Sequence, residues 1–138
     1  MSNKVAVDKA TERAMKKLGE LITECRGDRS LRKIAEPSGI AASQLQSIER
    51  GILAPTADVY PKLLDTLQLN EKQRADMDRL YMTIRKTPPP DVCELLINNP
   101  NLITILRAME DAKLNKKEMN SVLASIAQMK KKGETDNG

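Results

Sequence analysis

The chain has 138 residues, a formal net charge of +4 and a hydrophobic content of 40%, which fits one domain or one domain with an appendage. Aromatic residues make up only 1% of the sequence, so the core has to be aliphatic, which favours helices over a β-sandwich. Histidine is absent and Cys25 and Cys93 lie far apart, so we expect no metal site and two free thiols rather than a disulfide. No window is apolar enough for a membrane span and the charged N-terminus lacks a signal-peptide core, so we expect a cytoplasmic protein.

The positive charge is concentrated in the first part of the chain. Residues 1–55 carry ten Lys or Arg and seven Asp or Glu, a surplus of +3, whereas residues 91–138 carry seven of each. Contact with DNA phosphates requires such a surplus, although inert surfaces often carry one this small.

Helical periodicity dominates the N-terminal half. After a polar lead, a helix is predicted from near Asp8 to Cys25, where the turn at 26–28 ends it. Residues 30–51 then predict two short helices joined by a tight turn. Ser30 is a good N-cap for the first, Gly39 suits a left-handed position after it, and Gly51 ends the second.

The second of these short helices has an apolar side and a small polar side. Leu45 and Ile48, three residues apart, form its buried stripe. Its outer side carries no carboxylate and consists of Ala42, Ser43, Gln46, Ser47 and Arg50. Two helices joined by a glycine turn, the second with such a face, are typical of a DNA-binding helix-turn-helix, although an ordinary helical hairpin shows the same pattern.

This stretch resembles the phage-repressor type of helix-turn-helix regulator, often called the XRE family. The resemblance lies in residues 30–35, 38–40 and above all 43–51, where Ile48-Glu49-Arg50-Gly51 matches the Ile-Glu-x-Gly of the family. It covers about residues 14–69. The resemblance implies a five-helix, lambda-repressor-like domain over residues 1–86 that binds double-stranded DNA, and a repressor that acts as a homodimer.

In the family's pattern, a recognition helix at about residues 41–50 enters the major groove. Its base-facing positions correspond here to Ala42, Ser43, Gln46 and Ser47, and its phosphate contacts to Arg29, Ser30, Arg32, Gln44 and Arg50. Gln46 is long enough to bind adenine through two hydrogen bonds, and Ala42 can meet a thymine methyl group. We therefore expect modest direct readout, with DNA shape and dimer spacing adding specificity.

Three positions depart from the family's pattern. Leu31 stands where Gln is frequent, and Ala41 replaces the usual Ser or Thr cap of the recognition helix. Pro37 interrupts the preceding helix, and because proline disfavours the helical region in the residue before it, we expect Glu36 to leave that region.

Two more helices are predicted before a proline-rich linker. Thr56 or Asp58 is expected to cap a helix that holds Pro61 in its first turn. Asn70 and Gln73 form a capping box for a fifth helix. Residues 87–90 contain three consecutive prolines and predict an extended linker, with a polyproline ligand for a partner domain as the alternative.

Residues 91–132 predict a short helical C-terminal module, and residues 133–138 a polar tail. Capping boxes begin at Asp91 and Asn115, and the last helix is expected to end at Lys130–Lys132. That helix carries an apolar stripe of Met119, Val122, Leu123, Ile126 and Met129. Because three short helices bury little on their own, we expect the stripe to form a dimer interface, with intramolecular packing or a peptide or protein effector as alternatives.

No catalytic pattern is complete in the sequence. Ser30–Lys33 matches the Ser-x-x-Lys nucleophile motif, but its partner motifs are missing and the helix-turn-helix explains the segment. We expect a non-enzyme without a cofactor. Two alternatives to a regulator stay open: an antitoxin that controls its own promoter and binds a toxin through its C-terminal helices, and an adaptor that keeps the fold without binding DNA.

Overall fold

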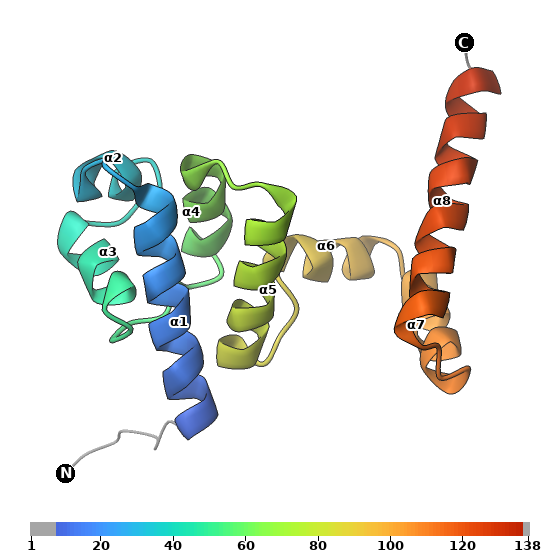
Figure 1. Ribbon diagram of the computed structural model, residues 1–138, viewed down its shortest axis with the longest axis horizontal. Helices are drawn as coiled ribbons and strands as arrows, with labels where there is room; N and C mark the ends of the chain where they lie inside the picture. The colour runs from blue at the N-terminus through green and yellow to red at the C-terminus, as the bar shows by residue number, and fades with distance from the viewer. Residues whose placement is uncertain (1–7, 137–138) are drawn as a thin grey trace. The chain divides into compact units, whose positions relative to one another are not determined.

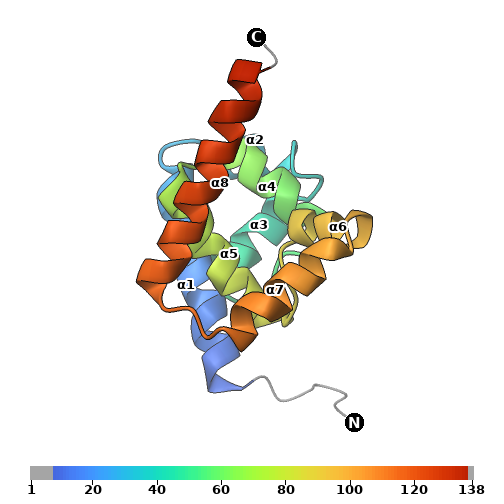
Figure 2. The same cartoon turned by 90° about the vertical axis from the view of Figure 1, so that its right-hand side faces the viewer.

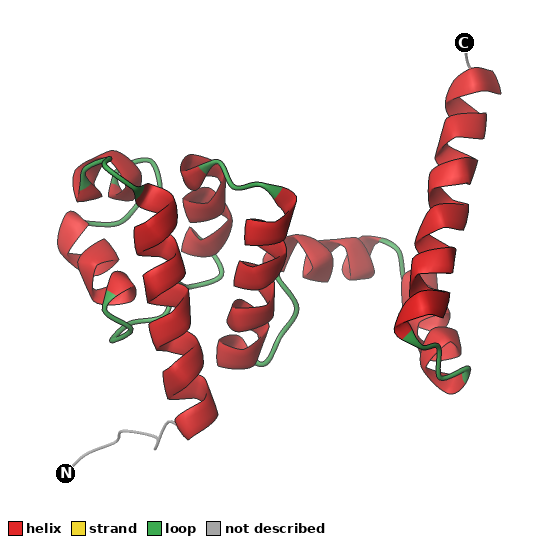
Figure 3. Ribbon diagram, viewed as in Figure 1, coloured by secondary structure: helices red, strands yellow, loops and turns green. Residues whose placement is uncertain are grey.

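The computed structural model describes residues 8–136, and this part of the chain is helical with no strand (Figures 1 and 3). The all-α prediction is therefore confirmed. The helices of the described part are α1 (Lys9–Arg26), α2 (Leu31–Ala35), α3 (Ala42–Glu49), α4 (Val59–Leu67), α5 (Glu71–Arg85), α6 (Pro90–Asn98), α7 (Asn101–Asp111) and α8 (Lys116–Asp136).

The chain divides into two compact units between Leu95 and Leu96. This division lies later than the predicted linker at 87–90, because the first turns of α6 belong to the first unit. Asp91 of α6 pairs there with Arg74 of α5 at 3.5 Å, and the Cys93 thiol donates to the carbonyl of Pro88.

Most helix ends lie where local sequence signals placed them. The side chains of Asp8, Ser30 and Asn70 accept hydrogen bonds from backbone N–H groups in the first turns of α1, α2 and α5. Asn115 and Glu118 form the capping box of α8. Gly27, Gly39 and Gly51 have φ angles of 58°, 79° and 76°, a region that glycine enters without strain.

Three local predictions are wrong. Glu36 keeps helical angles, φ −55° and ψ −54°, because its N–H still donates to Arg32 and the following turn holds Pro37 in place. Helix α6 begins at Pro90 rather than after an Asp91 cap, since a first helical residue needs no N–H. Helix α8 continues to Asp136, because one glycine at position 133 costs a helix only about 1 kcal/mol.

The first unit is built around one core to which α1 to α5 all contribute. Helix α1 lies between α3 and α5 and packs on both (Figure 1). The rings of Tyr60 and Tyr81 stack at 4.1 Å between centroids, and the Tyr60 hydroxyl donates to Asp78 at 2.7 Å. The buried side chains of this core are Leu18, Ile22, Ile34, Ala35, Leu45, Ile48, Tyr60, Leu63, Leu64, Leu67, Met77 and Tyr81.

The second unit contains α7 and α8, which diverge from the loop that joins them (Figure 2). None of the residues from 96 to 134 is buried. Large apolar side chains on both helices are exposed, among them Ile105, Leu106, Leu123, Ile126 and Met129. The described part of this unit therefore has no core of its own.

Candidate nucleic-acid interface

Helix α3 is fixed to the first unit along its inner side. Leu45 and Ile48 are buried in the core beside Ile34 and Ala35 of α2. The turn between α2 and α3 is closed by the N–H of Ile40, which donates to the carbonyl of Ala35. Packing on this side directs the opposite side of α3 to solvent.

The N-terminal end of α3 is capped by a residue inside the helix. Ala41 occupies the N-cap position and has no side-chain acceptor to offer. Instead, the Gln44 Oε1 atom accepts a hydrogen bond from the Ala41 N–H at 2.9 Å. Gln44 therefore supplies half of a capping box, and its amide group lies at the start of α3 with its N–H donors still available.

The C-terminal end of α3 is held by an ion pair with α1. Arg26 donates to both carboxylate oxygens of Glu49, at 2.7 and 2.9 Å, and its third nitrogen donates to the carbonyl of Arg29. The Glu49 side chain is only 8% exposed and that of Arg26 18%. The hydrogen bond with Glu49 raises the pKa of Arg26 above its usual value. Two parallel charge-assisted hydrogen bonds of this kind fix both position and angle.

A glycine in α1 allows α3 to approach closely. A Cβ atom at Gly19 would lie 2.3 Å from the Glu49 carbonyl oxygen and 2.6 Å from that of Ile48. A Cβ atom at Gly51, just beyond α3, would lie 2.8 Å from the Cα of Lys16. The last turn of α3 thus rests directly on the backbone of α1.

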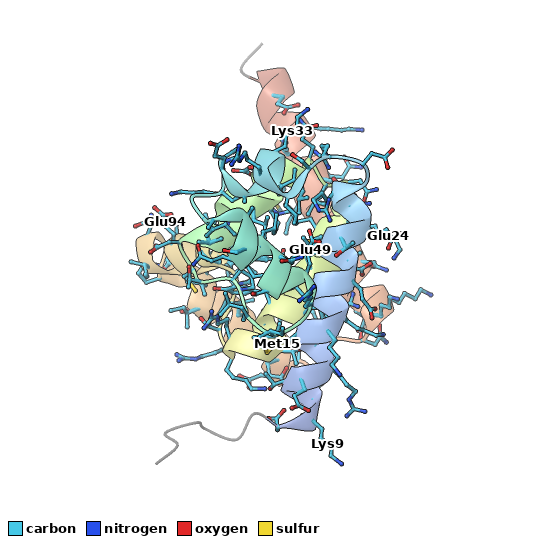
Figure 4. The ribbon with its side chains drawn as sticks, turned by 90° about the vertical axis from the view of Figure 1, so that its left-hand side faces the viewer. Lys9, Met15, Glu24, Lys33, Glu49 and Glu94 are labelled. Atoms are coloured by element: carbon cyan, nitrogen blue, oxygen red, sulfur yellow. The ribbon has the colours of Figure 1, made fainter. Side chains whose placement is uncertain are left out.

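The outer side of α3 presents small and polar groups. Ser43 and Gln46 are exposed, and Ala42 and Ser47 are half-buried. Glu49 is the one acidic residue of α3, and Arg26 holds both of its carboxylate oxygens. Figure 4 views this face, with Glu49 near its centre. The predicted base-facing residues therefore share one accessible surface without a free carboxylate.

Most of the predicted phosphate-contacting residues lie around that surface. Arg32 and Arg50 are exposed, and neither takes part in an ion pair among residues 8–136. The Ser30 oxygen accepts from the Lys33 N–H at 3.2 Å, and its hydroxyl hydrogen can still be donated. With Gln44, these residues place hydrogen-bond donors at both ends of α3.

The Arg29 side chain is bound to backbone carbonyls of its own unit. Its guanidinium donates to the carbonyls of Cys25 at 2.6 Å and Arg26 at 3.0 Å, and to those of Thr66 and Leu67 at 3.4 and 3.3 Å. Its donors therefore join the C-terminal ends of α1 and α4. Its phosphate contact stays a prediction, and the interface proposed below is built on Ser30, Arg32, Gln44 and Arg50.

Sequence reasoning missed the residues that support α3. Gly19 interrupts the amphipathic pattern of α1, and an isolated glycine inside a helix often marks close packing. Arg26 and Glu49 are separated by 23 residues, and no local pattern joins them. Arg85, which donates to the carbonyls of Ala54 and Pro55 in the loop after α3, gave no signal either.

Metal-binding clusters and membrane-spanning helices are not seen in the described part of the chain. Residues 8–136 contain no cluster of three or more Cys, Asp or Glu side chains that could hold a metal ion, and Cys25 and Cys93 are free thiols. Within the same range, no helix is both long and apolar enough to cross a bilayer. No protein-family model, curated protein or solved structure matches the chain. A functional assignment therefore has to rest on the geometry of its own residues.

Proposed function

We propose that the chain is a sequence-specific DNA-binding transcription regulator of the phage-repressor type, in which α3 enters the major groove. The five helices of the first unit would then form a lambda-repressor-like domain, and the second unit would join two copies. Repression, by occupying a promoter, is the activity we assign to this dimer.

The observation that carries the proposal is the way α3 is held. Its first turn is capped by Gln44, its last turn is fixed by Arg26 and Gly19, and its inner side is buried in the core. A helix that reads base edges has to be rigid and has to keep carboxylates away from phosphates, since phosphate repels them. Helix α3 meets both requirements.

The side chains on α3 indicate the kind of readout. Gln46 can form two hydrogen bonds with an adenine edge, while the Ala42 methyl group can pack on a thymine methyl group. The Ser43 and Ser47 hydroxyls can form hydrogen bonds with several base edges, so they discriminate only weakly between base pairs. Ser30, Arg32, Gln44 and Arg50 would bind phosphates on either side of the groove and fix the register of the helix.

The second unit supports a dimer. Met119, Val122, Ile126 and Met129 follow one another at spacings of three, four and three residues, the repeat of a coiled-coil seam. Leu123 and Ile126 are 64% and 55% exposed, and no residue of α7 or α8 up to position 134 is buried. A second copy offers the same stripe and would cover it symmetrically. Two recognition helices could then reach half-sites about 34 Å apart.

The proposal is tested by selecting binding sites from a pool of random DNA duplexes with the wild-type chain and with Gln46→Ala. We expect the wild type to enrich a two-fold symmetric site. Gln46→Ala should lose discrimination at one base pair per half-site, by about 1–3 kcal/mol.

The matched control is Gln128→Ala, which makes the same change at an exposed position of α8 away from the apolar stripe. It should select the same site as the wild type. Enrichment of no site by the wild type, or of an identical site by Gln46→Ala, would contradict the proposal.

A second candidate is an antitoxin that binds a toxin through the second unit and its own promoter through α3. The exposed apolar side chains of α7 and α8 favour it, since a small protein could cover them as well as a second copy could. The mass of the purified complex separates the two, because a toxin would copurify at a ratio fixed by its own interface.

A further inference from the structure

The exposed cations at the start of α1 are the strongest feature that the proposed interface leaves unexplained. Lys9, Arg13 and Lys16 follow one another at spacings of four and three residues and therefore share one side of the helix. All three are exposed, and they line one shallow depression together with Glu12. We refer to Lys9, Arg13 and Lys16 as the α1 stripe.

The α1 stripe continues the surface formed by α3. Gly19 lies one turn after Lys16, on the buried side of α1 next to the stripe, and touches the last turn of α3. The backbone of Lys16 lies against Gly51, the residue after Arg50. In Figure 4, Lys9 and Lys33 lie toward opposite ends of the face that carries α3, with Glu49 between them. A duplex lying along α3 would therefore meet Arg50 first and the α1 stripe next.

Positive charge is concentrated in the first half of α1. Lys9, Arg13, Lys16 and Lys17 stand there with one acidic residue, Glu12, whereas the second half carries Glu20, Glu24 and Arg26. The first half therefore has the surplus of positive charge that a polyanion would meet.

The carboxylates near the α1 stripe offset only part of its charge. Asp8, just before Lys9, accepts a hydrogen bond from the Thr11 N–H as the N-cap of α1. Glu12 lines the same depression, and Glu20 lines a separate depression beside α5. Among residues 8–136, no ion pair involves Lys9, Glu12, Arg13 or Lys16. The three cations therefore keep their charge available to a polyanion.

We infer that the α1 stripe is a second DNA contact, which binds the phosphates of the strand beyond the C-terminal end of α3. This inference rests on the proposed function of α3 and extends it. Contacts of this kind carry no base information, but they lengthen the footprint and increase affinity for any duplex.

The test compares two triple variants of the full chain that lose the same charge. The first is Lys9→Gln/Arg13→Gln/Lys16→Gln. The control is Lys72→Gln/Arg74→Gln/Arg79→Gln on α5, which packs on α1 and has no comparable contact with α3. The probe is a fluorescent duplex of mixed sequence, about three helical turns long, titrated at a series of salt concentrations.

We expect the α1 variant to bind at least about tenfold more weakly than the control at low salt, and its plot of log affinity against log salt to be shallower by about two to three units. Arg13→Gln alone should reduce that slope by about one unit, which keeps the test usable if the triple variant unfolds.

The outcomes separate this inference from the function it rests on. If the wild type binds the duplex and both triple variants lose affinity and slope equally, the α1 stripe makes no contact and only this inference is overturned. If the wild type does not bind even at the lowest salt, the proposed function and this inference fail together.

Discussion

The two units of the chain differ in how far their apolar side chains are buried. In the first unit, α1 to α5 bury Leu18, Leu45 and Leu63 to 1% exposure or less. In the second unit, side chains of the same kind such as Leu106 and Leu123 are more than half exposed. Burial of apolar area is the main stabilising term in folding. The first unit therefore carries its own stability, whereas α7 and α8 have no such core among the described residues.

Truncation of a leucine in each unit should give the largest contrast. Leu63 is fully buried, so Leu63→Ala should lower the free energy of unfolding by about 3 kcal/mol. Leu106 is 52% exposed, and Leu106→Ala should cost less than about 1 kcal/mol.

Urea unfolding followed by far-UV circular dichroism measures this directly, because the helices of both units contribute to the signal. Tyrosine fluorescence reports the first unit alone, since Tyr60 and Tyr81 are the only two aromatic residues and both lie in its core. Equal losses from the two leucine variants would mean that the second unit has a core of its own.

Replacing one glycine in each unit by alanine should change the stability of the two units in opposite directions. Gly19→Ala places a Cβ atom against the Glu49 carbonyl, so α1 or α3 has to shift, at a cost of about 2 kcal/mol. Gly133 in α8 has nothing within 4 Å of a new Cβ, so Gly133→Ala should stabilise that helix by up to about 1 kcal/mol. Thermal unfolding followed by circular dichroism checks both. A stabilising Gly19→Ala would show that α1 and α3 lie further apart than described.

Charges placed on the apolar stripe of α8 should separate the proposed dimer and leave the stability of the first unit almost unchanged. Leu123→Lys/Ile126→Lys is expected to convert a dimer to a monomer in solution, with less than about 0.5 kcal/mol of change in the first unit. Ala124→Lys/Gln128→Lys adds the same charge on the other side of α8 and should stay dimeric. Analytical ultracentrifugation measures the solution mass of the wild type and of both variants. A monomeric wild type would contradict the proposed dimer.

Local sequence signals predicted much of the first unit. Hydrogen-bonding caps such as Ser30 and Asn70, and the glycine at position 39, act within a few residues of their partners, so their effect can be read from the sequence. Helical periodicity also separated the outer set on α3, which includes Ser43 and Gln46, from the buried Leu45 and Ile48. The base-facing role of that outer set came only from the family resemblance. The structure leaves the DNA-contacting role of that set a prediction.

Tertiary contacts were beyond such reasoning. No local pattern indicates that Arg29 donates to carbonyls at the ends of α1 and α4, or that Arg26 reaches Glu49. The preference of a residue before proline for non-helical angles also gave a wrong prediction at Glu36, because neighbouring hydrogen bonds outweigh it there. A proline run likewise hid a helix start at Pro90, because the ring that breaks a helix interior is tolerated at its first position.

The most direct test of the central claim is an amide NMR titration of the full chain with duplex DNA at low salt. If α3 enters the major groove, the largest shifts should fall on residues 30–50, and they should be reversed by added salt. The α7 and α8 amides should move little. Large shifts confined to α7 and α8, or no shifts at all, would contradict the assignment of α3 as the DNA-reading helix.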